Sequence, residues 1–116
     1  MTPNAMAPSG SSGPNASGAL RDLGGGRFKL EGAVTMATVT NLRATGLRVF
    51  GQGSGAVDVD LSAVGRADSG ALALLIDWLA WARAARRVLK YSSPPAALLA
   101  LARLSDVEEL LLGHNP

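Results

Sequence analysis

The alternation of short β-type segments with helical segments is the feature that most constrains how this chain can fold. Residues 27–31, 56–61 and 88–91 are short and carry alternating or β-branched apolar residues, as strands do. Each of these segments is followed by a predicted helix, over residues 35–50, 69–87 and 92–104, which is indicated by helical spacing of apolar residues or by helix-start signals. The type of a last element at 107–112 is left open. Strands that alternate with helices are joined by right-handed crossovers and build a mainly parallel sheet. Because the chain is short, we expect a small α/β domain with a mainly parallel sheet and helices packed mostly on one face.

The ends of the chain differ in composition from its middle. The first 26 of the 116 residues are mostly Gly, Ser, Pro, Ala and Asn, so residues 1–26 are interpreted as a flexible N-terminal tail. Residues 27–112 are expected to form one domain, and residues 113–116 a short C-terminal tail. A domain of about 90 residues is large enough for one modest core.

Composition argues against several classes of protein. The chain has no cysteine, so we expect no disulfide, no thiol nucleophile and no thiolate metal site. The longest apolar run, residues 71–76, is far shorter than the roughly 20 residues of a membrane span, and residues 1–26 do not resemble a signal peptide. We therefore expect a cytoplasmic protein without direct membrane insertion. The net charge is only +2, and the basic residues near 83–90 are interpreted as complementing a helix C-terminus rather than as binding nucleic acid.

A catalytic site is not expected either. Asp60, Asp68 and Ser69 could be drawn as two carboxylates with a nucleophile, but the only histidine, His114, lies in the C-terminal tail, where it cannot serve as their base. Two carboxylates without His or Cys make a poor metal site, and no cofactor is indicated. Asp60 is interpreted as a structural hydrogen-bond acceptor at the end of its strand. The sequence thus indicates a protein that is not an enzyme.

Both tryptophans of the chain lie on the helix expected at 69–87. At about 100° per residue, one face of this helix carries core residues, namely Leu72, Leu75, Ile76, Leu79 and Ala82. A second apolar stripe consists of Leu74, Trp78, Trp81 and Ala85. This stripe either packs under a neighbouring segment of the same domain or contacts another protein. Since a small one-sided layer offers few internal neighbours and Trp is enriched at binding hot spots, we expect at least one of the two tryptophans to contact a partner.

The start of the same helix is a second candidate for a contact. Asp68 or Ser69 is a good N-cap, worth about 1 kcal/mol. The first helical turn leaves backbone amides exposed, and the small residues Gly70 and Ala71 would let another backbone approach closely. We therefore expect Asp68 to Ala71 to form a partner-binding surface together with the second stripe.

The run that leads into this helix, DLSAVGRADSGALALLIDW, resembles the signature of STAS domains. In that family, a strand ending in Asp-Leu-Ser leads through a short turn to Asp-Ser/Thr-small-small-Leu at a helix start. The order of the two small residues, Gly70-Ala71, is reversed relative to the common pattern. The resemblance covers residues 27–112. With LEGAVTMATVTNL and PPAALLALARLSDVEELL, the chain looks most like the MlaB type, the small cytoplasmic subunit of a phospholipid-transport ABC complex.

The resemblance implies a function for the helix start. Ser69 matches the hydroxyl residue that anti-anti-sigma relatives phosphorylate, and in the MlaB type this position lies at the contact with the ATPase. The chain is thereby expected to be a non-catalytic accessory subunit that binds the ABC transporter ATPase, peripheral at the inner membrane, and supports maintenance of lipid asymmetry. The alternative is an anti-anti-sigma factor that binds a kinase-type anti-sigma factor and is phosphorylated on Ser69. A third hypothesis is a homodimer in which the tryptophan stripes pair.

Overall fold

The computed structural model describes residues 18–112. Residues 1–17 of the N-terminal tail expected at 1–26, and the C-terminal tail expected at 113–116, lie outside the described residues. The elements are, in order, β1 (Ala19–Gly24), β2 (Arg27–Val34), α1 (Val39–Gly51), β3 (Val57–Ala67), α2 (Ser69–Ala84), β4 (Leu89–Ser92), α3 (Ala96–Leu104) and α4 (Glu108–Leu112). The alternation of strands and helices predicted from residue 27 onward is therefore confirmed, and the last element is a short helix.

The four strands form one sheet in the order β1-β2-β3-β4. β2 pairs with β3, and β3 with β4, in parallel, whereas β1 pairs with β2 antiparallel. The last pairs of the β2–β3 register are Ala33 with Arg66 and Val34 with Ala67, so both strands end at the same edge of the sheet. This pairing brings the turn before α1 next to the start of α2.

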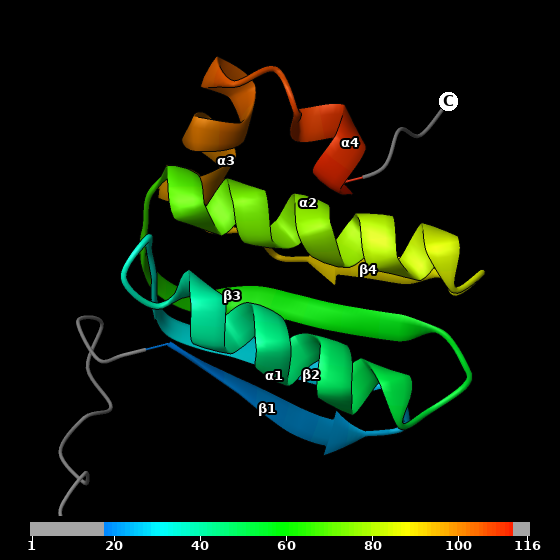
Figure 1. Cartoon of the computed structure of the whole chain (residues 1–116). Helices are drawn as coiled ribbons and strands as arrows, with labels where there is room; N and C mark the ends of the chain where they lie inside the picture. Colours follow the sequence, from blue (N-terminus) through cyan, green and yellow to red (C-terminus); the bar gives the residue numbers. More distant parts are fainter. Residues whose placement is uncertain (1–17, 113–116) are drawn as a thin grey trace, which may run out of the picture.

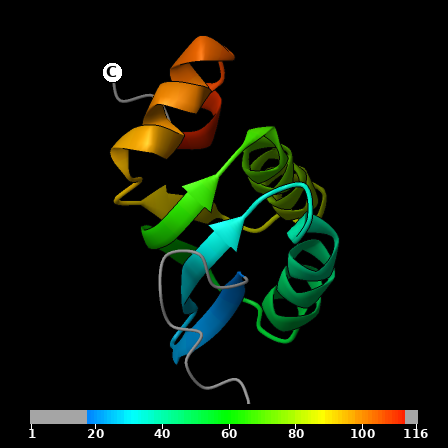
Figure 2. The ribbon, with the colours of Figure 1, turned by 90° about the vertical axis from the view of Figure 1, so that its left-hand side faces the viewer.

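The helices cover one face of the sheet, as expected. α1 and α2 lie side by side on this face, and α3 and α4 pack beyond α2 near the β4 edge (Figures 1 and 2). The opposite face is polar, because Arg27 and Lys29 of β2 lie beside Asp58 and Asp60 of β3, and Lys90 of β4 lies beside Asp58. Pairs of opposite charges on neighbouring strands stabilise this face, which therefore does not have to be covered by a helix.

The predicted N-terminal boundary is wrong at one point. Residues 19–24 belong to the sheet as β1, which pairs with β2 from Ala19 opposite Glu31 to Gly24 opposite Arg27. Three consecutive glycines, Gly24 to Gly26, all have positive φ and turn the chain between the two strands. The domain therefore begins before residue 27.

The third strand is longer than the segment expected at 56–61. Residues 62–67 continue β3, whose register against β2 shifts between Lys29 and Glu31 and again between Gly32 and Ala33. Such bulges let a long, twisted strand stay paired. At the end of α3, the side chain of Leu104 is 86% exposed.

Candidate protein-interaction surface

Asp68 ties the start of α2 to the turn before α1. Its backbone is extended, and its carboxylate accepts a hydrogen bond from the Gly70 N–H at 2.7 Å, as an N-cap does. The same carboxylate accepts the Met36 N–H, at 3.1 Å and 3.2 Å from its two oxygens. One side chain thus holds two loops that are 32 residues apart in the sequence.

Gly70 allows a close backbone approach, but the backbone belongs to the same chain. A Cβ at Gly70 would lie 2.7 Å from the Met36 nitrogen and 2.9 Å from the Thr35 carbonyl carbon. Gly70 is buried, and Ala71 is only 1% exposed. The interpretation that these two small residues receive a partner backbone is therefore wrong for this fold, because the turn before α1 already occupies that space.

Three other side chains remain accessible beside this junction. Ser69 and Ala73 are exposed and lie one helical turn apart on the same side of α2. Met36 is 65% exposed and adjoins them through the contact of its backbone with Asp68 and Gly70. Within residues 18–112 the Ser69 hydroxyl forms none of the hydrogen bonds recorded. We call Met36, Ser69 and Ala73 the α2-start surface.

The tryptophan stripe does not extend this surface. Leu74 and Trp78 are both 0% exposed, so the prediction that they contact a partner is wrong for this fold. α1 covers them: a Cβ at Gly46 would lie 2.4 Å from two carbons of the Trp78 indole. The indole also stacks edge-on against Phe50, with ring centroids 5.1 Å apart, and its N–H donates to the Arg43 carbonyl at 3.4 Å. Packing under a neighbouring helix is therefore the role of this part of the stripe.

Trp81 is only partly buried, but it lies far from the α2-start surface. It packs against Phe50 at 5.8 Å between centroids, and the Arg87 guanidinium lies 5.4 Å from its ring centroid. It lies twelve positions after Ser69 on α2, which corresponds to about 18 Å along the helix. The structure therefore does not bring Trp81 and Ser69 into one compact site.

Asp60 has a structural position. It lies inside β3 rather than at its end, and its carboxylate accepts the Ser62 N–H at 2.8 Å where the pairing with β2 shifts register. Hydrogen bonding from the backbone of Ser62, followed by that from its side chain, holds the pKa of Asp60 below its usual value. The charged carboxylate thus stabilises a bulge of the central strand.

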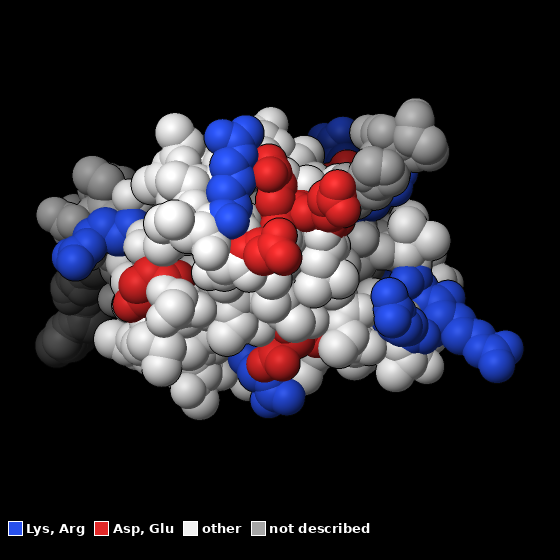
Figure 3. Space-filling view, turned by 90° about the horizontal axis from the view of Figure 1, so that it is seen from above, with Lys and Arg blue, Asp and Glu red and all other residues white. Residues whose placement is uncertain are grey.

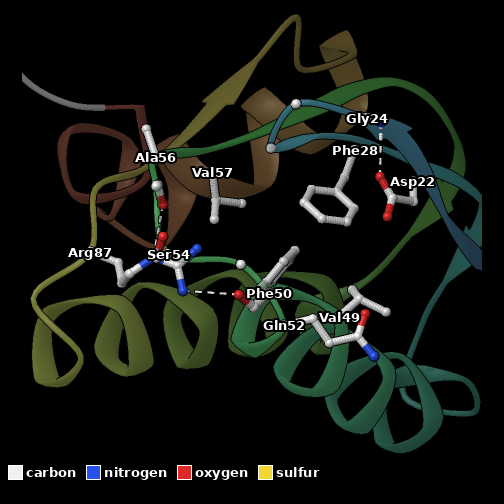
Figure 4. A pocket seen from close by; sticks show the side chains of 14 residues that line it. Asp22, Gly24, Phe28, Val49, Phe50, Gln52, Ser54, Ala56, Val57 and Arg87 are labelled. Atoms are coloured by element: carbon white, nitrogen blue, oxygen red, sulfur yellow. Dashed lines mark hydrogen bonds between the residues drawn. The ribbon is translucent and has the colours of Figure 1, made fainter.

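A hollow of about 470 Å³ lies at the opposite end of the sheet, between the β1–β2 turn and the loop that follows α1 (Figure 4). Sequence reasoning did not anticipate it, because its walls are two glycine-rich loops brought together only by strand pairing. Asp22 and Arg87 are its charged lining residues. Asp22 accepts the Gly24 N–H at 2.8 Å. Arg87 donates to the carbonyls of Gly55 at 2.8 Å and Phe50 at 2.9 Å, so both charges serve to hold the loops.

Two further properties of the described residues bear on other kinds of site. Over residues 18–112, no three or more of the metal-binding acidic and histidine side chains come together in a way that could hold a metal ion. In the same range, no helix has the length and apolar character required to cross a membrane.

Comparison with known families agrees with this description. A family model described as the Mlab, STAS domain matches residues 20–113, which is most of the chain and includes nearly all of β1. No curated protein matches the sequence.

Proposed function

Because the chain belongs to the STAS domain family, in its MlaB type, we propose that it is a non-catalytic accessory subunit of a phospholipid-trafficking ABC transporter. In this proposal it binds the ATPase subunit, supports assembly and activity of the complex, and lies in the cytoplasm, peripheral to the inner membrane. The match over residues 20–113 is the observation that carries the proposal.

The α2-start surface is the proposed contact with the ATPase. Ser69 and Ala73 are small, so a partner can approach the first turn of α2 closely, and Met36 offers a flexible apolar side chain that adapts to a facing surface. Asp68 contributes indirectly, since its hydrogen bonds fix the loop of Met36 against the helix start. A surface that is ordered before binding loses less conformational entropy on association.

One observation favours a second candidate function. The Ser69 hydroxyl is exposed at the first residue of a helix, a position open to a kinase. A phosphate there would add a charge of about −1.5 to −2, which the helix N-terminus tolerates but which would stand beside the Asp68 carboxylate. The corresponding function is that of an anti-anti-sigma factor, whose partner is a kinase-type anti-sigma factor.

Affinity purification of the tagged full-length protein from its own host tests both functions. The informative variant is Ala73→Arg, which places a long cation on the α2-start surface at an exposed position and so leaves the core intact. Ala44→Arg is the matched control, because Ala44 is an exposed alanine of α1. Trp78→Ala would be uninformative, since truncating this fully buried side chain costs about 3–5 kcal/mol and a loss of binding would not be distinguishable from a loss of folded protein.

Recovery of an ABC ATPase with its permease by the wild type and Ala44→Arg, but not by Ala73→Arg, would support the proposal. Recovery of a kinase-like anti-sigma factor, with phosphate on Ser69 by mass spectrometry, would establish the second function instead. If an ATPase is recovered equally by Ala73→Arg, the interface lies elsewhere on the domain.

A further inference from the structure

α2 is apolar on more sides than the domain covers. One side packs on the sheet, and a second packs under α1 through Leu74 and Trp78. A third side forms the floor of an open groove of about 370 Å³ beside α4, lined by Ile76, Leu79, Ala80, Arg83, Ala84 and Leu110. Leu110 is 50% exposed, and Ala80 and Ala84 are exposed. Apart from Arg83, the side chains that line the groove are apolar, and this third side of α2 lacks a covering partner within residues 18–112.

Clusters of opposite charge flank the groove. At the junction of α3 and α4, Asp106, Glu108 and Glu109 gather around Arg103, which pairs with Glu108 at 3.2 Å. Three carboxylates and one guanidinium make this an acidic cluster.

The basic cluster lies at the other side of the groove, where α2 ends. Arg83 lines the groove, and Arg86 lies three residues later in the sequence. Neither forms an ion pair within the described residues. Seen from above, acidic side chains gather over the α3–α4 region and basic side chains at the far end of α2, with uncharged surface between them (Figure 3).

We propose that this face is the interface of a two-fold symmetric homodimer of the chain. A surface with an apolar centre, a negative end and a positive end is complementary to a copy of itself rotated by 180°, as an interface related by a two-fold axis requires. In the dimer, the exposed sides of the two α2 helices pack against each other, with Ala80 and Ala84 allowing the helices to approach closely. The acidic cluster of each copy meets the basic end of the other, which fixes the antiparallel orientation.

This interface is separate from the proposed contact with an ATPase. The α2-start surface lies at Ser69, whereas the groove begins a full two turns later, so one copy can use both surfaces. It also differs from a dimer made by the tryptophan stripe, because Trp78 is buried under α1.

The first test is the mass of the purified full-length protein by light scattering from about 1 µM to about 1 mM, the range of weak association. We expect the mass to rise with concentration toward twice the 11.8 kDa of one chain. Added salt should oppose this rise, because the paired clusters are exposed charges that salt screens. A monomer throughout this range would overturn the proposal.

Charge reversal then tests the orientation. Arg83→Glu/Arg86→Glu and Glu108→Lys/Glu109→Lys should each weaken self-association by about tenfold or more, since like charges then face each other at both ends. Mixing the two variants should restore a heterodimer, because reversed clusters again meet opposite charges. Arg48→Glu, a reversal in the last turn of α1, is the matched control and should dimerise as the wild type does. Failure of the mixture to associate would refute the two-fold arrangement.

A substitution in the groove completes the test. Ala80→Arg fills the groove from an exposed helix position and should abolish the dimer, while Ala44→Arg on α1 should not. Circular dichroism and thermal unfolding establish that each variant is folded. A dimer that survives Ala80→Arg would show that the groove serves another ligand or protein, and would overturn the assignment.

Discussion

The replacement Gly46→Ala tests the packing of α1 on α2 most directly. A Cβ at this position would lie 2.4 Å from Cε2 and Cζ2 of Trp78 and 2.5 Å from Nε1. Ordinary contacts between carbon atoms are about 3.5–4.0 Å, so the indole or the helix must move by about 1 Å. The indole has little freedom to move, because it is fully buried and stacked against Phe50.

Two opposing effects determine the magnitude. Alanine in place of glycine inside a helix stabilises it by about 1 kcal/mol. Overpacking a rigid core typically costs about 1–3 kcal/mol, and three ring atoms in collision place Gly46→Ala at the upper end. We therefore expect the free energy of unfolding to fall by about 2 kcal/mol, which corresponds to a Tm lower by roughly 8–16 °C for a domain of this size.

Chemical and thermal denaturation monitored by circular dichroism measure this change. Gly51→Ala is the matched control on the same helix, because a Cβ there would meet nothing within 4 Å. It should leave stability unchanged or raise it by up to about 1 kcal/mol. A second check is Gly46→Ala combined with Trp78→Phe, in which the smaller ring should recover part of the loss. A Gly46→Ala protein as stable as the wild type would refute the described contact.

Three further predictions concern polar side chains. Asp68→Ala should lower the free energy of unfolding by about 1–2 kcal/mol in urea denaturation, since it removes a helix cap and the bond to the preceding turn. Arg87→Lys keeps the positive charge, but an ammonium group cannot reproduce the planar guanidinium that binds the two carbonyls, so amide hydrogen exchange in residues 52–56 should accelerate. The fluorescence of Trp81 should also shift, because the guanidinium over its ring is lost. Asp60→Ala should change the pH dependence of stability. In the wild type, the hydrogen bond from the Ser62 backbone lowers the pKa of the Asp60 carboxyl in the folded state. The stabilisation by this carboxylate is therefore complete above the ordinary pKa of 3.8 and is lost as pH falls through the folded-state pKa. The stability difference from the wild type should therefore be largest near neutral pH and shrink below pH 3.8, as urea titrations at several pH values would show.

The sequence was sufficient for the fold class and for a helix cap at Asp68 or Ser69, which the structure assigns to Asp68, because helix caps and the alternation of elements are local signals. It was not sufficient to predict that Trp78 is buried inside the domain. The angular position of Trp78 on α2 can be worked out from spacing, but its burial depends on Gly46, which is 32 residues away and provides the space for the indole. No local pattern shows that these two positions pair.

β1 was missed for a different reason. In this strand only Leu20 is partly buried and the other residues are exposed, so the segment lacks the alternation of apolar and polar residues that identifies a strand. Its pairing with β2 is made by the backbone, which any sequence can supply.

The hairpin of β1 and β2 determines what the sheet presents to other chains. β2 is a long central strand only because β1 occupies its outer edge. In a truncated chain beginning at Arg27, the backbone N–H and C=O groups of β2 would be unpaired along that edge, and unprotected edges of this kind recruit strands from other molecules. A short polar strand that adds almost nothing to the core therefore protects the domain against aggregation.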